Sequence, residues 1–433
     1  MKTNRLFLLV ISFTVASSVF AAEIQGVPAE LNDVEKRMVS WVDSRQSEML
    51  DELEKHVELN TGTENIAGID QYRSIIERQL QGLGFATQLH SSDPLPVLSC
   101  NGGKTVFADH LEATRKGKKK NRVLLNGHLD TVFPAHDKFQ TLQVEGDGTL
   151  RGPGVADMKG GLVVMLYALK ALDAEGRLAD ANITVFLNTD EEIGSLGSRR
   201  LIEDIARKHD VGLVFESSHN NKMTRSRKGL GQARLKITGR ESHAGAAHER
   251  GVSANLELAH KVIAIEKLTN YEQQVTVNVG VMSGGEKRNT VPGCSDAYID
   301  LRYPTSASGK ELQSKISQIS ADKTFVNTQF PDLPKTEVWT KLHRPAKVRD
   351  KMVDQLISES MGLSEVLGEK ITGTRFSGGG TDGSIMQSVG LSTLDSLGVD
   401  GEGAHSSREK TSLKSLIART KLATVMISRQ IDK

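Results

Sequence analysis

The segment from Val123 to Asp130 reads VLLNGHLD, three apolar residues followed closely by a histidine and an aspartate that could bind a metal ion. Similar apolar runs occur at residues 183–187 and 211–215, and helical patterns at about residues 160–175 and 198–208 precede them. The runs are continuous rather than alternating, which is typical of strands buried on both faces. Strands that alternate with helices in this way predict an α/β fold whose sheet is covered on both sides.

The hydropathy pattern changes after about Ser226, where alternating strands and two helices indicate a smaller α+β domain. The strands are expected at residues 235–238, 275–281 and 297–302, and the helices at about residues 254–268 and 310–319. After Pro345 helical and apolar stretches resume, with a Gly-rich loop at residues 377–384. We therefore expect a large α/β domain, built from residues 23–225 and 340–433, that is interrupted by a small domain at residues 226–339.

Composition limits the classes of function. The chain has 433 residues, 38% of them hydrophobic and 25% charged, so a packed core is feasible. Lys and Arg number 55 and Asp and Glu 54, and this balance argues against a protein that wraps nucleic acid. Two cysteines exclude a disulfide-rich scaffold and a Cys-rich zinc module. The sequence cannot decide whether Cys100 and Cys294 pair, but their positions in different predicted domains argue against it.

The first 22 residues have the pattern of a secretory signal. Lys2 and Arg5 precede a mainly apolar run from Leu6 to Ala16, and small residues then lead to Ala21-Ala22. The run is shorter than the ~20 apolar residues that a membrane-spanning helix needs. We expect cleavage near Ala22 and a soluble, secreted or periplasmic protein without membrane contact; an uncleaved anchor is the alternative.

Metal-type ligands stand at the ends of several predicted strands and at the start of a helix. They are His128 and Asp130, Asp157, Glu191 and Glu192, and Glu216. Sites in open α/β sheets form outside the carboxyl ends of the strands, so these side chains should meet in one crevice. Each pattern alone is usually structural, a surface ion pair or an acidic helix start. Their joint occurrence favours a metal site.

The charges of this set require compensation. Asp157, Glu192 and Glu216 would bring three carboxylates together, which two divalent cations could balance. His128 and one further histidine would complete the coordination, and His405 in the small-residue segment GAHS is the candidate. Imidazole and carboxylate ligands together suit zinc, with cobalt or manganese as substitutes.

At these residues the sequence resembles the M20 family of metallopeptidases, in particular its glutamate carboxypeptidase branch. The matching segments span nearly the whole chain after the signal and stand in family order: residues 127–134 (GHLDTVFP), 151–161 (RGPGVADMKGG), 187–195 (LNTDEEIGS), 242–246 (SHAGA), 378–382 (GGGTD) and 403–406 (GAHS). The resemblance implies a zinc-binding catalytic domain, a smaller lid or dimerisation domain, and a homodimer.

The resemblance also implies how the ligands divide between two zinc ions. His128, Asp157 and Glu216 would hold one ion. Asp157, Glu192 and His405 would hold the other, so that Asp157 bridges the pair.

Two further carboxylates acquire roles by resemblance. Asp130 is similar to the residue that orients a ligand imidazole and raises its basicity. Glu191 is similar to the general base of amide hydrolysis, which takes a proton from water and returns it to the leaving amine. Neighbouring side chains in a pleated segment point in opposite directions, so Glu191 would face the water while Glu192 binds metal.

The small domain is expected to complete the site. His243 resembles a histidine that reaches into the partner subunit's active site and stabilises the oxyanion. Arg302 resembles the arginine that binds the substrate carboxylate. Further candidate substrate contacts, from the same resemblance, are Lys222, Arg344, Asn289 and Gly380.

The predicted function is that of a zinc carboxypeptidase that releases a C-terminal residue, glutamate by preference, from peptides or N-acyl amino acids. Ser217 and Met158 depart from residues common in the family, but neither removes a ligand. The alternatives are an aminopeptidase, a dipeptidase or an N-acyl-amino-acid deacylase on the same scaffold, and a non-catalytic metal- or peptide-binding protein. A serine hydrolase is disfavoured because no Gly-x-Ser-x-Gly segment occurs.

Overall fold

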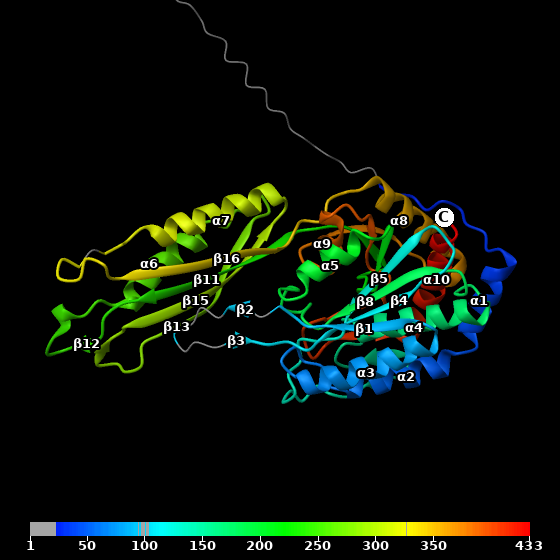
Figure 1. The fold of residues 1–433 in the computed structure, drawn as a ribbon, viewed down its shortest axis with the longest axis horizontal. Helices are drawn as coiled ribbons and strands as arrows, with labels where there is room; N and C mark the ends of the chain where they lie inside the picture. The colour runs from blue at the N-terminus through cyan, green and yellow to red at the C-terminus, as the bar shows by residue number, and fades with distance from the viewer. Residues whose placement is uncertain (1–22, 94, 97–99, 101–103, 326) are drawn as a thin grey trace, which may run out of the picture.

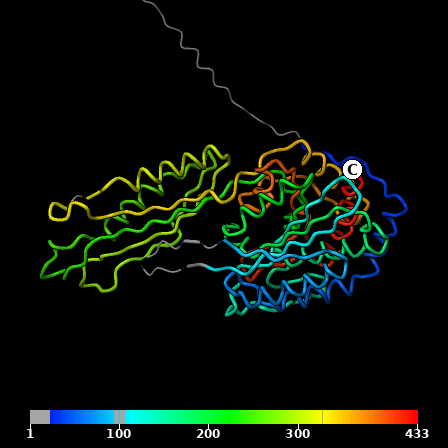
Figure 2. Tube along the Cα trace, in the orientation of Figure 1, coloured from blue at the N-terminus to red at the C-terminus, as the bar shows by residue number. Residues whose placement is uncertain are grey.

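The computed structural model describes residues 23–433 apart from residues 94, 97–99, 101–103 and 326. The predicted signal segment at residues 1–22 therefore lies outside the described residues. The molecule is elongated, with a large α/β domain at one end and a smaller α+β domain at the other (Figure 1). The predicted fold class is confirmed. Figure 2 follows the chain out of the large domain, through the small one in green and yellow, and back.

A six-stranded mixed sheet forms the centre of the large domain. Its order is β1 (Ala86–His90), β4 (His110–Arg115), β8 (Asn182–Asn188), β5 (Arg122–His128), β9 (Val211–Val214) and β18 (Thr393–Leu394). The four strands from β8 to β18 are parallel; β4 pairs antiparallel with β8, and the edge strand β1 pairs antiparallel with β4. Because β8, β5 and β9 are parallel neighbours, the segments that follow them emerge at the same edge of the sheet.

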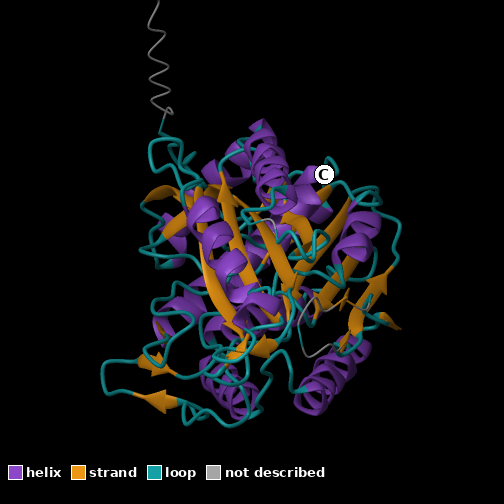
Figure 3. Ribbon diagram, turned by 90° about the vertical axis from the view of Figure 1, so that its left-hand side faces the viewer, coloured by secondary structure: helices purple, strands orange, loops and turns teal. Residues whose placement is uncertain are grey.

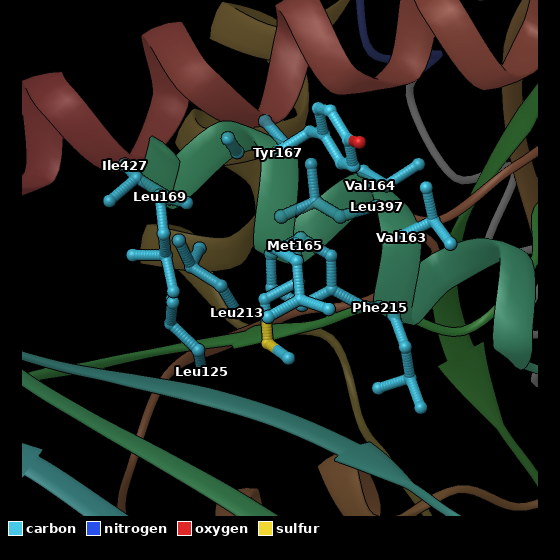
Figure 4. Packing of buried hydrophobic residues seen from close by; sticks show 14 of the residues in the cluster. Leu125, Val163, Val164, Met165, Tyr167, Leu169, Leu213, Phe215, Leu397 and Ile427 are labelled. Atoms are coloured by element: carbon cyan, nitrogen blue, oxygen red, sulfur yellow. The ribbon is translucent and has the colours of Figure 1, made fainter. Parts of the chain in front are cut away.

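Helices cover both faces of this sheet. On one face, Leu125 packs in the larger core cluster, to which six helices contribute buried residues: α1 (Asp33–Asp43), α2 (Gln46–Glu58), α3 (Ile66–Gly82), α4 (Lys159–Ala174), α8 (Lys351–Leu367) and α10 (Leu413–Ile431). Its neighbour Leu124 belongs to the other cluster, with α5 (Arg199–Ala206) and α9 (Asp382–Ser388). Successive strand residues face opposite sides, which explains the continuous apolar runs in the sequence. Figure 4 shows α4 packed between α10 and the sheet.

The small domain is an antiparallel four-stranded sheet with two helices. The strand order is β13 (Thr276–Gly284), β15 (Cys294–Tyr303), β11 (Gly229–Thr238) and β16 (Lys335–Arg344), and the helices are α6 (Ala254–Glu266) and α7 (Ser306–Ala321). Ala233, Leu235 and Ile237 alternate into the core beneath these helices. Strand β16 continues past Trp339, where the sequence pattern ended the domain, to Arg344. Figure 3 views the molecule from the end that carries this domain.

A disulfide joins the two domains, contrary to the expectation from sequence. Cys100 follows the short strand β2 (Leu95–Pro96), which pairs with β3 (Lys104–Thr105) and extends from the large domain towards the small one (Figure 1). Cys100 is bonded to Cys294 at the start of β15, with 6.1 Å between the Cα atoms. The backbone N–H of Cys100 also donates to Asp296 Oδ2 at 3.1 Å. The two cysteines belong to different domains, but this projection brings them together.

Short elements complete the fold. In the large domain, β10 (Lys222–Arg227) pairs with β17 (Gly373–Ser377), and β6 (Gln143–Val144), β7 (Thr149–Arg151) and β19 (Lys410–Ser412) form a small sheet. At the tip of the small domain, β12 (Ser242–His243) pairs with β14 (Thr290–Val291), near a 3₁₀ turn at His248–Arg250 (Figure 1). A search of the described helices finds none with the length and hydrophobicity to cross a bilayer.

Candidate metal centre

Four of the five predicted metal ligands lie at the same edge of the large sheet. His128 is the last residue of β5, Glu192 lies in the turn after β8, and Glu216 follows β9. Asp157 precedes α4, whose first turn packs directly against the end of β9: a Cβ on Gly161 would overlap the carbonyl oxygen of Phe215. This close packing sets Asp157 beside the strand ends.

Asp157 lies at the centre of the cluster, with one histidine on each of its carboxylate oxygens. His128 Nε2 lies 3.2 Å from Oδ1, and His405 Nε2 lies 3.3 Å from Oδ2. His405 Nε2 is also 3.1 Å from Glu192 Oε2, and His128 Nε2 is 3.6 Å from Glu216 Oε1. The five side chains predicted to bind metal, distant in sequence, therefore meet in one cluster.

The spacing of these atoms suits metal ions. Ligand atoms of His128, Asp157 and Glu192 lie within 4.8 Å of one another, and so do those of His128, Glu191 and Glu216. A carboxylate oxygen of Glu191, the predicted general base, is therefore close enough to His128 and Glu216 to bind the same metal ion. Among the described residues Glu192 Oε1 is buried and has no hydrogen-bond partner. A buried carboxylate oxygen without a hydrogen-bond partner is available to coordinate a metal cation.

The electrostatics of the cluster also call for positive charge. Burial, with the negative charge of Asp157 as the next cause, raises the pKa of Glu192 to about 8 and the pKa of Glu216 well above its usual value. Hydrogen bonds to Asp157 and Glu192 raise the pKa of His405 to about 11. In the absence of metal, the raised pKa values favour the protonated forms of Glu192, Glu216 and His405. Divalent cations would supply the same compensation with neutral imidazoles and ionised carboxylates, so the donor set fits metal binding.

His405 has a backbone conformation that residues other than glycine rarely adopt. Its φ is 62°, in the left-handed region, and its side chain is 57% exposed. The turn around it is held by the Ser406 N–H, which donates to the Gly403 carbonyl at 3.1 Å. A left-handed residue costs about 1 kcal/mol relative to the right-handed form, and such strain concentrates at functional sites.

Asp130 connects His128, a predicted metal ligand, to the turn that carries both glutamates. Its Oδ1 lies 3.3 Å from His128 Nδ1, and its backbone carbonyl lies 3.0 Å from the same nitrogen. Its two carboxylate oxygens also accept the backbone N–H groups of Glu191 and Glu192, each at 3.2 Å. The glutamates therefore lie in a turn fixed by Asp130, and the expectation of a pleated segment was wrong.

Glu191 is buried and forms an ion pair. Its Oε1 lies 2.5 Å from an Nη atom of Arg344, which is itself buried at the end of β16. Burial raises the pKa of Glu191 to about 7, although Arg344 and His128 both act to lower it. A carboxyl group in this state can exchange a proton near neutral pH, as a general base must. Arg344, predicted to bind substrate, contacts the predicted base.

Two neighbours of Asp157 were not found by sequence reasoning. Glu409 Oε1 accepts the backbone N–H groups of Ala156 and Asp157, at 2.8 and 2.9 Å, and so fixes the peptide that carries the Asp157 carboxylate. Met158, which departs from the family pattern, packs its sulfur against the backbone N–H of His128 at 3.2 Å. The spacing of Glu409 from His405 was the only available signal for its role.

A cavity of about 340 Å³ opens beside the cluster. Asp157, Glu191, Glu192, Glu216 and His405 form one part of its wall, and the predicted contacts Arg302, Arg344 and Gly380 line it as well. Arg302 is already paired with Asp300, at 2.7 Å. The lining also contains Arg227, Gln232, His343 and Arg375, which sequence reasoning missed because no motif includes them.

Three predicted residues lie elsewhere. His243 and Asn289 belong to the β12–β14 tip of the small domain, where the N–H of Ala244 donates to the carbonyl of Asn289 at 2.9 Å (Figure 1). Lys222 is exposed at the start of β10. None of the three is among the described residues that line the cavity. In a single chain the structure does not bring them to the metal cluster.

Comparisons with known proteins agree with this geometry. A model of peptidase family M20/M25/M40 matches residues 124–429. Carboxypeptidase G2 of Pseudomonas sp. (strain RS-16) is 30% identical over 366 residues, which cover 84% of this chain and 84% of that protein. Acetylornithine deacetylase of Pasteurella multocida (strain Pm70) is 30% identical over 249 residues, 53% of this chain and 61% of that protein.

A solved structure shares the fold. The tripeptidase from Staphylococcus aureus subsp. aureus mu50 is 23% identical and superposes with a TM-score of 0.67, covering 90% of this chain and 99% of that one. Enzymes of the matched family are metal-dependent, in keeping with the cluster of histidines and carboxylates around Asp157. The fold, the order of the ligands along the chain and the family match lead to one conclusion: the chain is a hydrolase of peptidase family M20/M25/M40.

Proposed function

We propose that the protein is a two-zinc carboxypeptidase that hydrolyses the amide bond before a C-terminal glutamate or a similar residue, in peptides or N-acyl amino acids. The observation that carries the proposal is the arrangement of His128 and His405 on opposite oxygens of Asp157, with Glu191 buried beside them. The likeness to carboxypeptidase G2 over 84% of both chains supports the choice of a carboxypeptidase.

His128, Asp157, Glu192, Glu216 and His405 would hold the two ions. When bound, such ions polarise the scissile carbonyl and lower the pKa of water towards neutrality. Glu191 takes the proton of the attacking water and returns it to the leaving amine. Asp130 keeps His128 oriented, and Arg344 holds the Glu191 carboxylate towards the cavity. Arg302 binds the carboxylate of the C-terminal residue, for which a guanidinium is well suited.

The main rivals share the scaffold. The deacetylase and the tripeptidase among the similar proteins favour an N-acyl-amino-acid deacylase, or a peptidase that needs a free amino terminus, as the second candidate. A non-catalytic binding protein is the third candidate, but it has no need for a proton acceptor such as Glu191.

A panel of dipeptides separates these candidates. With zinc-loaded protein, we expect N-blocked dipeptides ending in glutamate to be cleaved at a kcat/KM about 10- to 100-fold above those ending in leucine, because an ion pair of the second carboxylate contributes that much. Dipeptides with a free amino terminus test the aminopeptidase. Cleavage of only the free-terminus substrates would contradict the proposal, and no turnover by metal-replete protein would favour the binding protein.

We further propose a homodimer in which the tip of each small domain completes the partner's site. Strand β12, which carries His243, lies at the tip of the small domain (Figure 1), and neither His243 nor Asn289 lines the cavity beside the metal cluster of its own chain, which supports this assembly. A symmetric pair can exchange such tips, because a two-fold axis makes both contacts at once. His243 would then donate a hydrogen bond to the developing oxyanion across the interface.

Co-expression of two inactive variants tests this exchange. His243→Ala and Glu191→Gln chains should each form nearly inactive dimers, whereas mixed dimers contain one complete site, so about a quarter of the unmodified activity should return. Co-expression of His243→Ala with the double variant Glu191→Gln/His243→Ala is the matched control and should return none. Failure of the first mixture to regain activity, with dimers present in both, would show that His243 does not act across subunits.

We also propose export to an oxidising compartment. The leader pattern at residues 1–22 supports it, and so does the bond between Cys100 and Cys294, because such bonds persist mainly outside the cytosol.

A further inference from the structure

Four of the described residues that line the cavity are arginines, and three of them are already bound to carboxylates. Arg227 pairs with the buried Asp395 at 2.8 Å, Arg302 with Asp300 at 2.7 Å, and Arg344 with Glu191 at 2.5 Å. In each case the positive charge is compensated by a neighbour within the protein. The fourth arginine differs.

Arg375 lies on β17 and has no such partner. Its Nε donates to Thr224 Oγ1 at 3.1 Å, and among the described residues its two Nη atoms make no hydrogen bond to the protein. Among the described residues no carboxylate oxygen lies within 4.0 Å of its nitrogens, and the side chain is only half-buried. Among the described residues the guanidinium therefore has no direct ion-pair partner, although Asp395, Asp400 and Glu216 act on it at longer range.

The position of Arg375 on its strand directs it to the cavity. Residues two apart on a strand share a face, and Ser377, two positions further along β17, lines the same wall. The Gly379–Gly380 segment follows immediately and lines the cavity as well. Arg302, on the small domain, approaches this segment from the other side, since its Nη1 lies 3.4 Å from the Gly378 carbonyl. Arg375 and Arg302 thus lie on either side of the Gly378–Gly380 segment at the cavity wall.

Two cations in one cavity match a ligand with two acidic groups. Arg302 is paired with Asp300 but partly exposed, so it can still bind the terminal carboxylate, and a second carboxylate can engage the free Nη atoms of Arg375 with two parallel hydrogen bonds. The acids around Asp157 make their direct contacts with His128 and His405, and none of them forms a direct ion pair with Arg375.

We propose that Arg375 is a specificity-determining residue that binds the side-chain carboxylate of a C-terminal glutamate or aspartate. The inference rests on the proposed carboxypeptidase function and identifies the protein group that binds the acidic side chain of the substrate. Lys222, to which the resemblance pointed, lies opposite Gly373 on the neighbouring strand, exposed and outside the cavity lining. Arg375 lies opposite Thr224, further along the same strand pair and at the cavity.

The test compares two blocked dipeptides of the same shape, one ending in glutamate and one in glutamine. In Arg375→Gln, kcat/KM for the glutamate substrate should fall about 10- to 100-fold, while the value for the glutamine substrate stays within about twofold. The glutamine substrate also reports whether the variant is folded. Arg200→Gln, which removes an exposed arginine on α5, is the matched control and should change neither value. Arg375→Glu should reverse the preference towards a C-terminal lysine.

A binding measurement separates this inference from the proposed function. Calorimetry with the metal-loaded protein should show free glutamate binding about tenfold more weakly to Arg375→Gln than to the unmodified chain, with glutamine unaffected. If the unmodified chain cleaves neither blocked dipeptide, the proposed function fails, and the calorimetry still decides the role of Arg375. Equal losses for both substrates, or unchanged glutamate binding, would overturn the inference.

Discussion

Glu191→Gln is expected to lower kcat by about 10²- to 10⁴-fold while the zinc content stays unchanged. Glutamine has the same shape but cannot take a proton from water, so the chemical step loses its base. The buried position of Glu191 and its contact with Arg344 at 2.5 Å hold the side chain where a base is needed. The measurement is kcat on the preferred blocked dipeptide, together with metal analysis of the same sample.

The neighbouring Glu192→Gln is the matched control. It makes the same chemical change one residue away, on a side chain that contacts His405 at 3.1 Å, and it should reduce the zinc content as well as the rate. If Glu191→Gln loses metal to the same extent, Glu191 is a ligand, as its nearness to His128 and Glu216 would also permit. An unchanged kcat would contradict the assignment of the base.

Asp157→Asn is expected to remove both zinc binding and activity, the latter by at least about a thousandfold. An amide carries no charge and offers one oxygen, whereas the two oxygens of Asp157 face His128 and His405. Treating the unmodified protein with a chelator should cause the same loss, and zinc should reverse it there but not in the variant.

Glu402→Gln provides the comparison for this prediction. Glu402 lies in the same loop as His405, but its carboxylate is half-exposed and 3.4 Å from Lys410. The variant should keep its metal and its rate. Full activity in chelated protein, or two zinc ions retained by Asp157→Asn, would show that the cluster around Asp157 is not the catalytic centre.

Much of the candidate metal site could be predicted from the sequence because several of its residues directly follow predicted strands. His128, Glu192 and Glu216 each follow an apolar run, and parallel neighbours carry such segments to one edge. The fold class followed from the same runs. The boundary between α1 and α2 is less apparent in the sequence: α1 ends before Ser44, whose hydroxyl donates to the Trp41 carbonyl at 2.7 Å.

The remaining features depend on contacts between distant segments, which no local pattern records. Arg375 and Arg227 are ordinary cations in the sequence, and only the pairing of β17 with β10 sets them beside the cavity. Arg344 was predicted to bind substrate, but its contact with Glu191 depends on how β16 enters the large domain. The pairing of Cys100 with Cys294 depends on a projection between domains that hydropathy does not predict.

The disulfide between Cys100 and Cys294 also limits the crosslinks that oxidation of the chain can form. Cys100 and Cys294 are the only cysteines in the sequence, so a single chain has just one way to form a crosslink, and any scrambled product must contain two chains. Closing a loop of 194 residues lowers the entropy of the unfolded chain, which corresponds to about 5 kcal/mol of stabilisation. A thiol reductant therefore acts on this protein at one bond only, the one between Cys100 and Cys294, and after reduction the two domains remain joined by the chain segments before β11 and after β16.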